Sequence, residues 1–205
     1  KSSAAGSRML LLIAFFQQLD YQVSFASPAQ RTEHMVDLNE LNVSCADISL
    51  NCSSFDDFIS TLQPDVVMFD RFMMEEQFGW RVSEHCPQAL RVLDSEDLFC
   101  LRHARHDAHK QNRVMAEADL LSSELAQREV AAIFRSDLTL MISPKETELL
   151  VDLFKVDASL LHYLPFVFNK NQLEQINPCY EQRQDFISIG NFRHPPNWDS
   201  VLWLK

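Results

Sequence analysis

Two kinds of hydrophobic pattern alternate along this chain. The run Val66-Val67-Met68-Phe69 is apolar at every position, which is typical of a central strand buried on both faces of a parallel sheet. From Met9 to Phe16 the chain is also apolar throughout, but the polar residues Gln17 and Gln18 follow it, and Met9, Leu12, Ile13 and Phe16 have the three- and four-residue spacing of one helix face. Both patterns return several times, and polar or proline-containing turns separate them.

This alternation predicts the fold class. The expected strands cover residues 21–26, 43–48, 66–69, 90–93, 138–142, 160–164 and 186–190. The expected helices cover residues 7–19, 29–41, 55–62, 74–86, 110–135 and 145–154, with a last one from residue 196. Strands and helices in this order indicate an α/β protein with a Rossmann-like parallel sheet, right-handed crossovers and helices on both faces.

The pattern also predicts how the chain is divided. Residues 1–168 are expected to form a Rossmann-like domain, residues 169–184 a polar linker, and residues 185–205 the start of a second Rossmann-like domain. Residues 1–6 resemble the loop that follows a first strand, but no strand precedes them. Because that strand is normally central in a doubly wound sheet, we expect the sequence to be a fragment in which the first strand is missing.

Charge, hydropathy and cysteine content argue against several classes of protein. The formal net charge of −11 and a sequence pI of about 5.0 disfavour binding to nucleic acids or to anionic membrane surfaces. No apolar run approaches the roughly 20 residues that span a bilayer, and no signal peptide is recognisable. Five scattered cysteines without a C-x-x-C pair indicate reduced thiols. We therefore expect a cytoplasmic protein with no transmembrane segment and no nucleic-acid partner.

Common cofactor and nucleophile motifs are missing. With only three glycines, the chain has no G-x-G-x-x-G, no P-loop and no G-x-S-x-G elbow. His103, His106 and His109 recur every three residues, but on a helix their directions drift apart, so a solvated helix face is the simpler interpretation. The sequence predicts neither a metal site nor a bound cofactor.

Candidate ligand-binding residues follow the predicted strands, because parallel sheets bind ligands beyond the carboxyl ends of their strands. Backbone amides around Gly6, Ser7 and Arg8 are placed to approach an anion, although this stretch is equally compatible with a plain turn. Asp70 and Arg71 end the next strand. Arg71 would bind a carboxylate or phosphate, or the two residues simply form a pair that ties down the strand end.

The densest polar cluster follows the strand at 90–93. Asp94 and Asp97 are candidates to bind sugar hydroxyls or to act as a base, with Arg102 and His103 close behind in the sequence. The alternative is purely structural: Ser95 would cap a helix whose first turn contains Glu96 and Asp97.

One stretch resembles a known family. Gly190-Asn191-Phe192-Arg193-His194-Pro195-Pro196-Asn197-Trp198-Asp199, followed by Val201 to Leu204, resembles the opening of the donor-side domain in retaining GT-B glycosyltransferases of the family-4 type. Four earlier stretches agree in order: Ala5 to Met9, Pro64 to Val67, Ser136 to Ser143 with Glu146, and Leu161 to Phe166.

The resemblance implies a reaction. A nucleotide-sugar donor would pass its sugar, with retention of configuration, to a hydroxyl acceptor on a saccharide, lipid or protein. The donor phosphates would lie at two loops, and the acceptor side would carry the catalytic carboxylates. The residues so assigned are Gly6, Ser7, Arg8, Gly190, Asn191 and Arg193 for the donor phosphates, Asp94 and Asp97 for catalysis, and Asp70, Arg71, Arg102 and His103 for the acceptor.

The family's donor-binding Arg/Lys pair and E-x7-E element would lie beyond Lys205. The 205-residue chain alone is therefore expected to be inactive, and activity is expected of the full-length enzyme. Two alternatives remain open. The chain is also compatible with a non-catalytic Rossmann-like module that binds a partner protein or carbohydrate, and with a sugar-nucleotide epimerase of the same two-domain architecture.

Overall fold

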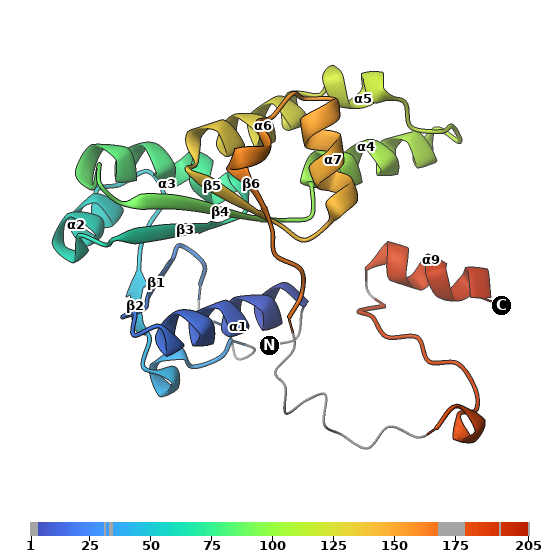
Figure 1. The fold of residues 1–205 in the computed structure, drawn as a ribbon, viewed down its shortest axis with the longest axis horizontal. Coiled ribbons are helices and arrows are strands. Elements are labelled where there is room, and N and C mark those ends of the chain that lie inside the picture. The colour runs from blue at the N-terminus through green and yellow to red at the C-terminus, as the bar shows by residue number, and fades with distance from the viewer. Residues whose placement is uncertain (1–3, 31, 33–34, 168–178, 193, 205) are drawn as a thin grey trace. The chain divides into compact units, whose positions relative to one another are not determined.

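The computed structural model describes residues 4–30, 32, 35–167, 179–192 and 194–204. Contacts within the chain divide it into two units, Lys1–Val167 and Phe168–Lys205. The first unit holds all the strands that the described residues form (Figure 1).

Parallel strands make up two sheets in the first unit. Strands β1 (Ser24–Ser27) and β2 (Ser44–Asp47) form one pair. The other sheet has the order β3 (Val66–Asp70), β4 (Leu90–Glu96), β5 (Leu138–Met141) and β6 (Leu161–Tyr163). Every strand pair is parallel, and helices flank the sheets. The predicted α/β class with a Rossmann-like parallel arrangement is confirmed.

The described part of the first unit contains seven α-helices, of which the first precedes the strands and the others lie between them: α1 (Ala4–Gln18), α2 (Ser54–Leu62), α3 (Phe72–His85), α4 (Phe99–Lys110), α5 (Glu117–Leu121), α6 (Glu124–Arg135) and α7 (Pro144–Asp152). Local signals fix several of their ends. Pro144 opens α7, and the Ser143 side chain accepts a hydrogen bond from the Glu146 N–H.

The main core lies between the four-stranded sheet and helices α3 and α6, which pack on each other. Leu93 of β4, Val82 of α3 and Ile133 of α6 are completely buried there. Met141 and Leu150 extend this core toward β5 and α7. The sheet is therefore held in place along its length, which fixes where its strand ends lie.

Two predicted helices differ from the structure. In place of a helix at 29–41, the described residues form only the 3₁₀ turn η1 (Leu38–Leu41), because the Asp37 side chain caps it at the start and left-handed Asn42 ends it. The predicted helix 110–135 is divided into the end of α4, then α5 and α6. Asn112, with φ 52°, ends the first piece, and Ser123 caps the last.

The second unit contains little regular structure among its described residues. These residues form a 3₁₀ turn, η3 (Tyr180–Gln182), and one helix, α9 (Pro195–Leu204). The predicted strand at 186–190 is wrong. Phe186 and Ile187 are almost fully exposed, and no described strand pairs with them, so the backbone bonds that a strand needs are not made. A short 3₁₀ turn, η2 (Ala158–Leu160), precedes β6 in the first unit.

Candidate functional site

The candidate site lies at the carboxyl ends of β3 and β4. These strands pair in a register that sets Asp70 beside Asp94, so the polar residues that follow both strands gather at one edge of the sheet. The Arg71 N–H donates to the Asp94 carbonyl at 2.9 Å and continues the pairing by one step. We call Asp70, Arg71, Asp94 and Glu96, with Arg8 of α1, the carboxyl-edge cluster.

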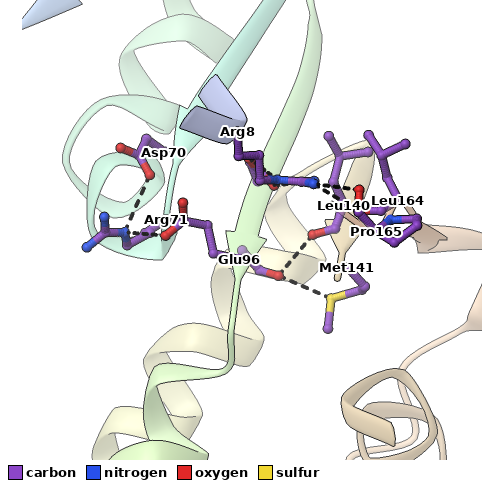
Figure 2. Close-up of polar contacts among 10 residues, drawn as sticks. Arg8, Asp70, Arg71, Glu96, Leu140, Met141, Leu164 and Pro165 are labelled. Carbon is purple, nitrogen blue, oxygen red and sulfur yellow. Dashed lines mark hydrogen bonds and ion pairs between the residues drawn. The ribbon is translucent and has the colours of Figure 1, made fainter. Parts of the chain in front are cut away.

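A buried ion pair joins α1 to this edge. Arg8 donates from Nε and Nη2 to Asp94, at 3.0 to 3.2 Å, and the two side chains are only 2% and 1% exposed. The Arg8 Nη1 donates to the carbonyl oxygens of Leu164 and Pro165, at 2.9 and 3.2 Å (Figure 2). Both charges are thus compensated, as a buried pair requires. This geometry favours a positioning role for Arg8 and Asp94 over contact with a substrate.

Arg71 has an unusual backbone. Its φ of 70° and ψ of 160° fall in a region that is essentially restricted to glycine, and such strain concentrates at functional sites. Its Nε lies 3.1 Å from Oε2 of Glu96 and 3.4 Å from Oδ1 of Asp70 (Figure 2). Glu96 has a positive φ as well, 56°. Two adjacent strand ends therefore hold strained residues that are joined by one guanidinium.

The two carboxyl groups beside Arg71, those of Asp70 and Glu96, both have raised pKa values. Burial raises the pKa of Asp70, with a smaller raising effect from Asp94, while Arg71 opposes the change. Burial likewise raises the pKa of Glu96 against the opposing effect of Arg71, and the neighbouring Asp70 adds to the rise. A carboxyl group with a raised pKa is a better proton acceptor near neutral pH. The Arg71 and Asp70 side chains are 41% and 50% exposed, so this part of the cluster is accessible to a ligand.

The remaining acceptor-side candidates lie just outside the cluster. Asp97 and Arg102 form a half-exposed ion pair of 3.2 Å, and the Arg102 guanidinium stacks 4.8 Å from the centre of the Phe99 ring. His103 pairs with Asp107 along α4 at 3.2 Å. It lines a hollow of about 660 Å³ between α4, α5 and α6. The hollow contains no member of the carboxyl-edge cluster.

The first predicted phosphate loop is helical. Gly6 and Ser7 lie in the opening turns of α1 rather than in a loop, because α1 begins at Ala4. In the second unit, Gly190 lies against Asn197, whose side-chain amide donates to the Asn191 carbonyl at 3.1 Å. Arg193 lies outside the described residues. The donor-phosphate assignments of Gly6, Ser7, Gly190, Asn191 and Arg193 stay predictions.

The predicted cap of the helix after β4 is wrong. β4 extends to Glu96, and the Ser95 hydroxyl donates to the Leu140 carbonyl at 3.0 Å. The N-terminus of α4 is capped from another helix: Glu129 of α6 accepts from the Phe99 and Cys100 N–H groups at 2.9 and 2.8 Å. The sequence contained one indication that Glu129 is buried. It falls on the apolar face of α6, between Ala126 and Ala132.

The described residues lack two further kinds of site, and comparison with known proteins identifies no relative. No group of three or more His, Cys, Asp or Glu side chains among the described residues is placed to hold a metal ion. Within that same part of the chain, every helix is too short or too polar to cross a bilayer. A scan against protein-family models and a search of curated proteins each found no match to this chain.

Proposed function

We propose that this protein is a retaining glycosyltransferase that passes a sugar from a nucleotide-sugar donor to a hydroxyl acceptor. The observation that carries the proposal is the carboxyl-edge cluster, in which Arg71, strained and half exposed, lies between two carboxyl groups of raised pKa. Ligands of open parallel sheets bind at this edge. The resemblance of residues 190–199 to the donor-side domain of the family supports the same reaction.

The cluster suggests a division of roles. Glu96 and Asp70 would accept hydrogen bonds from the acceptor hydroxyl, because carboxylate oxygens accept what hydroxyl groups donate. Arg71 would hold an anionic part of the acceptor or of the donor through its planar guanidinium. Arg8 and Asp94 would position this edge without touching the reactants. Asp97 and Arg102, which are half exposed beside the cluster, would add further contacts to the acceptor.

The test is nucleotide-sugar turnover by the natural protein, with a panel of UDP- and GDP-sugars and detection of the released nucleoside diphosphate. Arg71→Ala and Glu96→Gln are expected to reduce release by roughly 10²-fold, the usual scale of a lost acid–base or positioning group. Glu148→Gln is the matched control, since Glu148 is an exposed acid that pairs with Lys145 on α7 and belongs to no candidate site. Equal activity in all variants would remove the cluster from the reaction.

A non-catalytic binding module is the second candidate, favoured by one observation. Asp94, one of the two predicted catalytic carboxylates, is buried and fully engaged by Arg8. If no sugar in the panel is turned over but a carbohydrate or protein binds in a manner sensitive to Arg71→Ala, this reading replaces the transferase. Conversion of the donor sugar into its epimer, without transfer, would instead identify an epimerase.

A further inference from the structure

Strands β1 and β3 each pair on one side only among the described strands. In β3, the Asp65 carbonyl and the Arg71 N–H bond to β4. Because the bonding direction of a strand alternates from residue to residue, Met68 directs its N–H away from β4. In β1, the Val23 and Ser27 carbonyls bond to β2, so Ala26 directs its N–H away from β2. Each edge therefore presents a row of backbone groups for which no described strand supplies partners.

The side chains of β3 and α1 are apolar but only partly buried. Val66, Val67 and Met68 of β3 are half-buried, whereas Leu93 in the neighbouring strand β4 is completely buried. Helix α1 is apolar around most of its circumference, which is typical of a helix that is buried on all sides. Its Phe15 nevertheless remains 53% exposed.

The two edges belong to one core. Ala26 of β1 and Val67 of β3 pack against the same cluster of buried residues, which also contains Ile48 from the end of β2 and Phe69 from β3. A pair of parallel strands and a set of four parallel strands thus share one core without being bonded to each other. Unpaired edges of this kind are the usual site of strand addition.

The direction of an added strand follows from α1. The Arg8–Asp94 pair holds the N-terminus of α1 at the carboxyl ends of the strands, and β1 begins after α1 has ended. In an α/β unit, a helix that starts at the carboxyl edge follows a strand that ends at that edge. Arg8 thus marks the place where such a strand would finish.

We propose that one extended apolar segment, joined directly to the N-terminus of α1, adds as a strand between β1 and β3 and runs parallel to β3. Its N–H and C=O groups bond to Met68 on one side and to Ala26 on the other, which unites the two sheets into one. The segment is apolar at successive positions, because a central parallel strand is covered on both faces. The inference does not depend on the proposed glycosyl transfer.

The test adds such a segment to the chain. A fusion places an apolar run of five residues, the length of β3, ahead of Lys1 through a short Gly-Ser turn; the probe is Val-Ile-Val-Val-Leu. The matched control is Val-Pro-Val-Pro-Leu, since proline cannot donate to a ladder. Amide hydrogen exchange at Met68 and Ala26 is expected to slow by roughly tenfold or more relative to the control. The N–H groups of Val67 and Phe25 point toward β4 and β2, which are already paired, so exchange at these two amides serves as an internal reference.

A second variant distinguishes pairing of the added strand from a general effect of the fusion on stability. Ala26→Pro removes the N–H that faces the added strand and leaves the β1–β2 bonds intact. The Val-Ile-Val-Val-Leu fusion is expected to have a higher thermal midpoint than the control fusion, because the added strand is bonded on both sides. Ala26→Pro is expected to abolish this difference in the Val-Ile-Val-Val-Leu fusion and to change the midpoint of the control fusion little. Equal exchange at Met68 and Ala26 in the two fusions, or equal effects of Ala26→Pro in both, would overturn the proposal.

Discussion

Gly79 lies against the carboxylate of Glu75, one helical turn earlier in α3, with no room between them for a methyl group. A Cβ at Gly79 would overlap Oε1 of Glu75 and come within 3.0 Å of its Cδ. Glu75 is 2% exposed and accepts bonds of 2.6 to 3.1 Å from Arg135 of α6. The glycine therefore makes room for the ion pair that joins the two core helices.

Gly79→Ala is expected to destabilise the fold by about 1–3 kcal/mol, because the added methyl displaces a buried, paired carboxylate. This is opposite in sign to the usual effect of the substitution in a helix, where alanine is favoured by about 1 kcal/mol. Urea denaturation measures the difference. Glu84→Ala, an exposed change on the same helix, is the control. A Gly79→Ala protein as stable as the parent would contradict the account.

The Arg8–Asp94 pair is expected to show strong coupling in a double-mutant cycle. Arg8→Met leaves the Asp94 charge buried and unpaired, which costs about 3–5 kcal/mol. Adding Asp94→Leu removes that charge and should recover a large part of the loss. The free energies of unfolding of the parent, both single variants and the double variant give the coupling directly. Additive effects of the two changes would show that the pair is not a unit.

Arg71 allows backbone strain to be separated from side-chain contacts. Arg71→Ala removes the ion pairs with Asp70 and Glu96 but keeps the strained conformation, whereas Arg71→Gly also relieves the strain. The glycine variant should therefore be more stable than the alanine variant by about 1–3 kcal/mol. Denaturation of the two proteins side by side tests this. If alanine is the more stable residue, the conformation at position 71 is not strained.

Thr139 of β5 is completely buried, and its hydroxyl has no hydrogen-bond partner among the described residues. Thr139→Val replaces this hydroxyl with a methyl group and is expected to stabilise the protein by about 1 kcal/mol, because a buried group without a partner is removed. Thr147→Val is the opposite case, since the Thr147 hydroxyl donates to the Ser143 carbonyl at 3.0 Å. Thermal midpoints that move the same way in both variants would refute the argument.

Acid stability should depend on Asp119. Hydrogen bonds from Arg113, and then from the Ala116 N–H, lower the pKa of Asp119 from 3.8 to about 2. Because the pKa is lower in the folded state, this group stabilises the fold above pH 4 and loses that effect as the pH falls toward 2. Asp119→Asn should therefore flatten the dependence of unfolding free energy on pH in this window. Denaturant titrations at a series of pH values measure the slope, and an unchanged slope would exclude the effect.

In the first unit, the sequence was sufficient to place the strands but not to identify the groups that surround their ends. Continuous apolarity at 66–69 identified β3, and the rule for parallel sheets directed attention to Asp70, Arg71 and Asp94. Glu96 was missed as a cluster residue because β4 runs three residues past its apolar part. The pairing of Asp94 depends on Arg8, which is 86 residues away in the sequence, and no local pattern contains such a partner.

In the second unit, the sequence predicted a strand that the structure does not contain. Phe186 to Gly190 has the composition of a strand, and composition alone predicted one. Strand formation needs a neighbour to accept its backbone bonds, and the described residues supply none. Helix α9 needs no such neighbour, because its bonds are internal, and it begins at Pro195 as the Pro-Pro sequence favours.

The four acceptors of Arg8 have a consequence for how the protein is made. They belong to residues 94, 164 and 165, so the contacts span 86, 156 and 157 positions of the chain. Contacts this distant in sequence form late, since long loops must close first. During synthesis, α1 leaves the ribosome well before its anchors do. The anchoring of α1 through Arg8 is therefore complete only after residue 165 has emerged, long after α1 itself has been made.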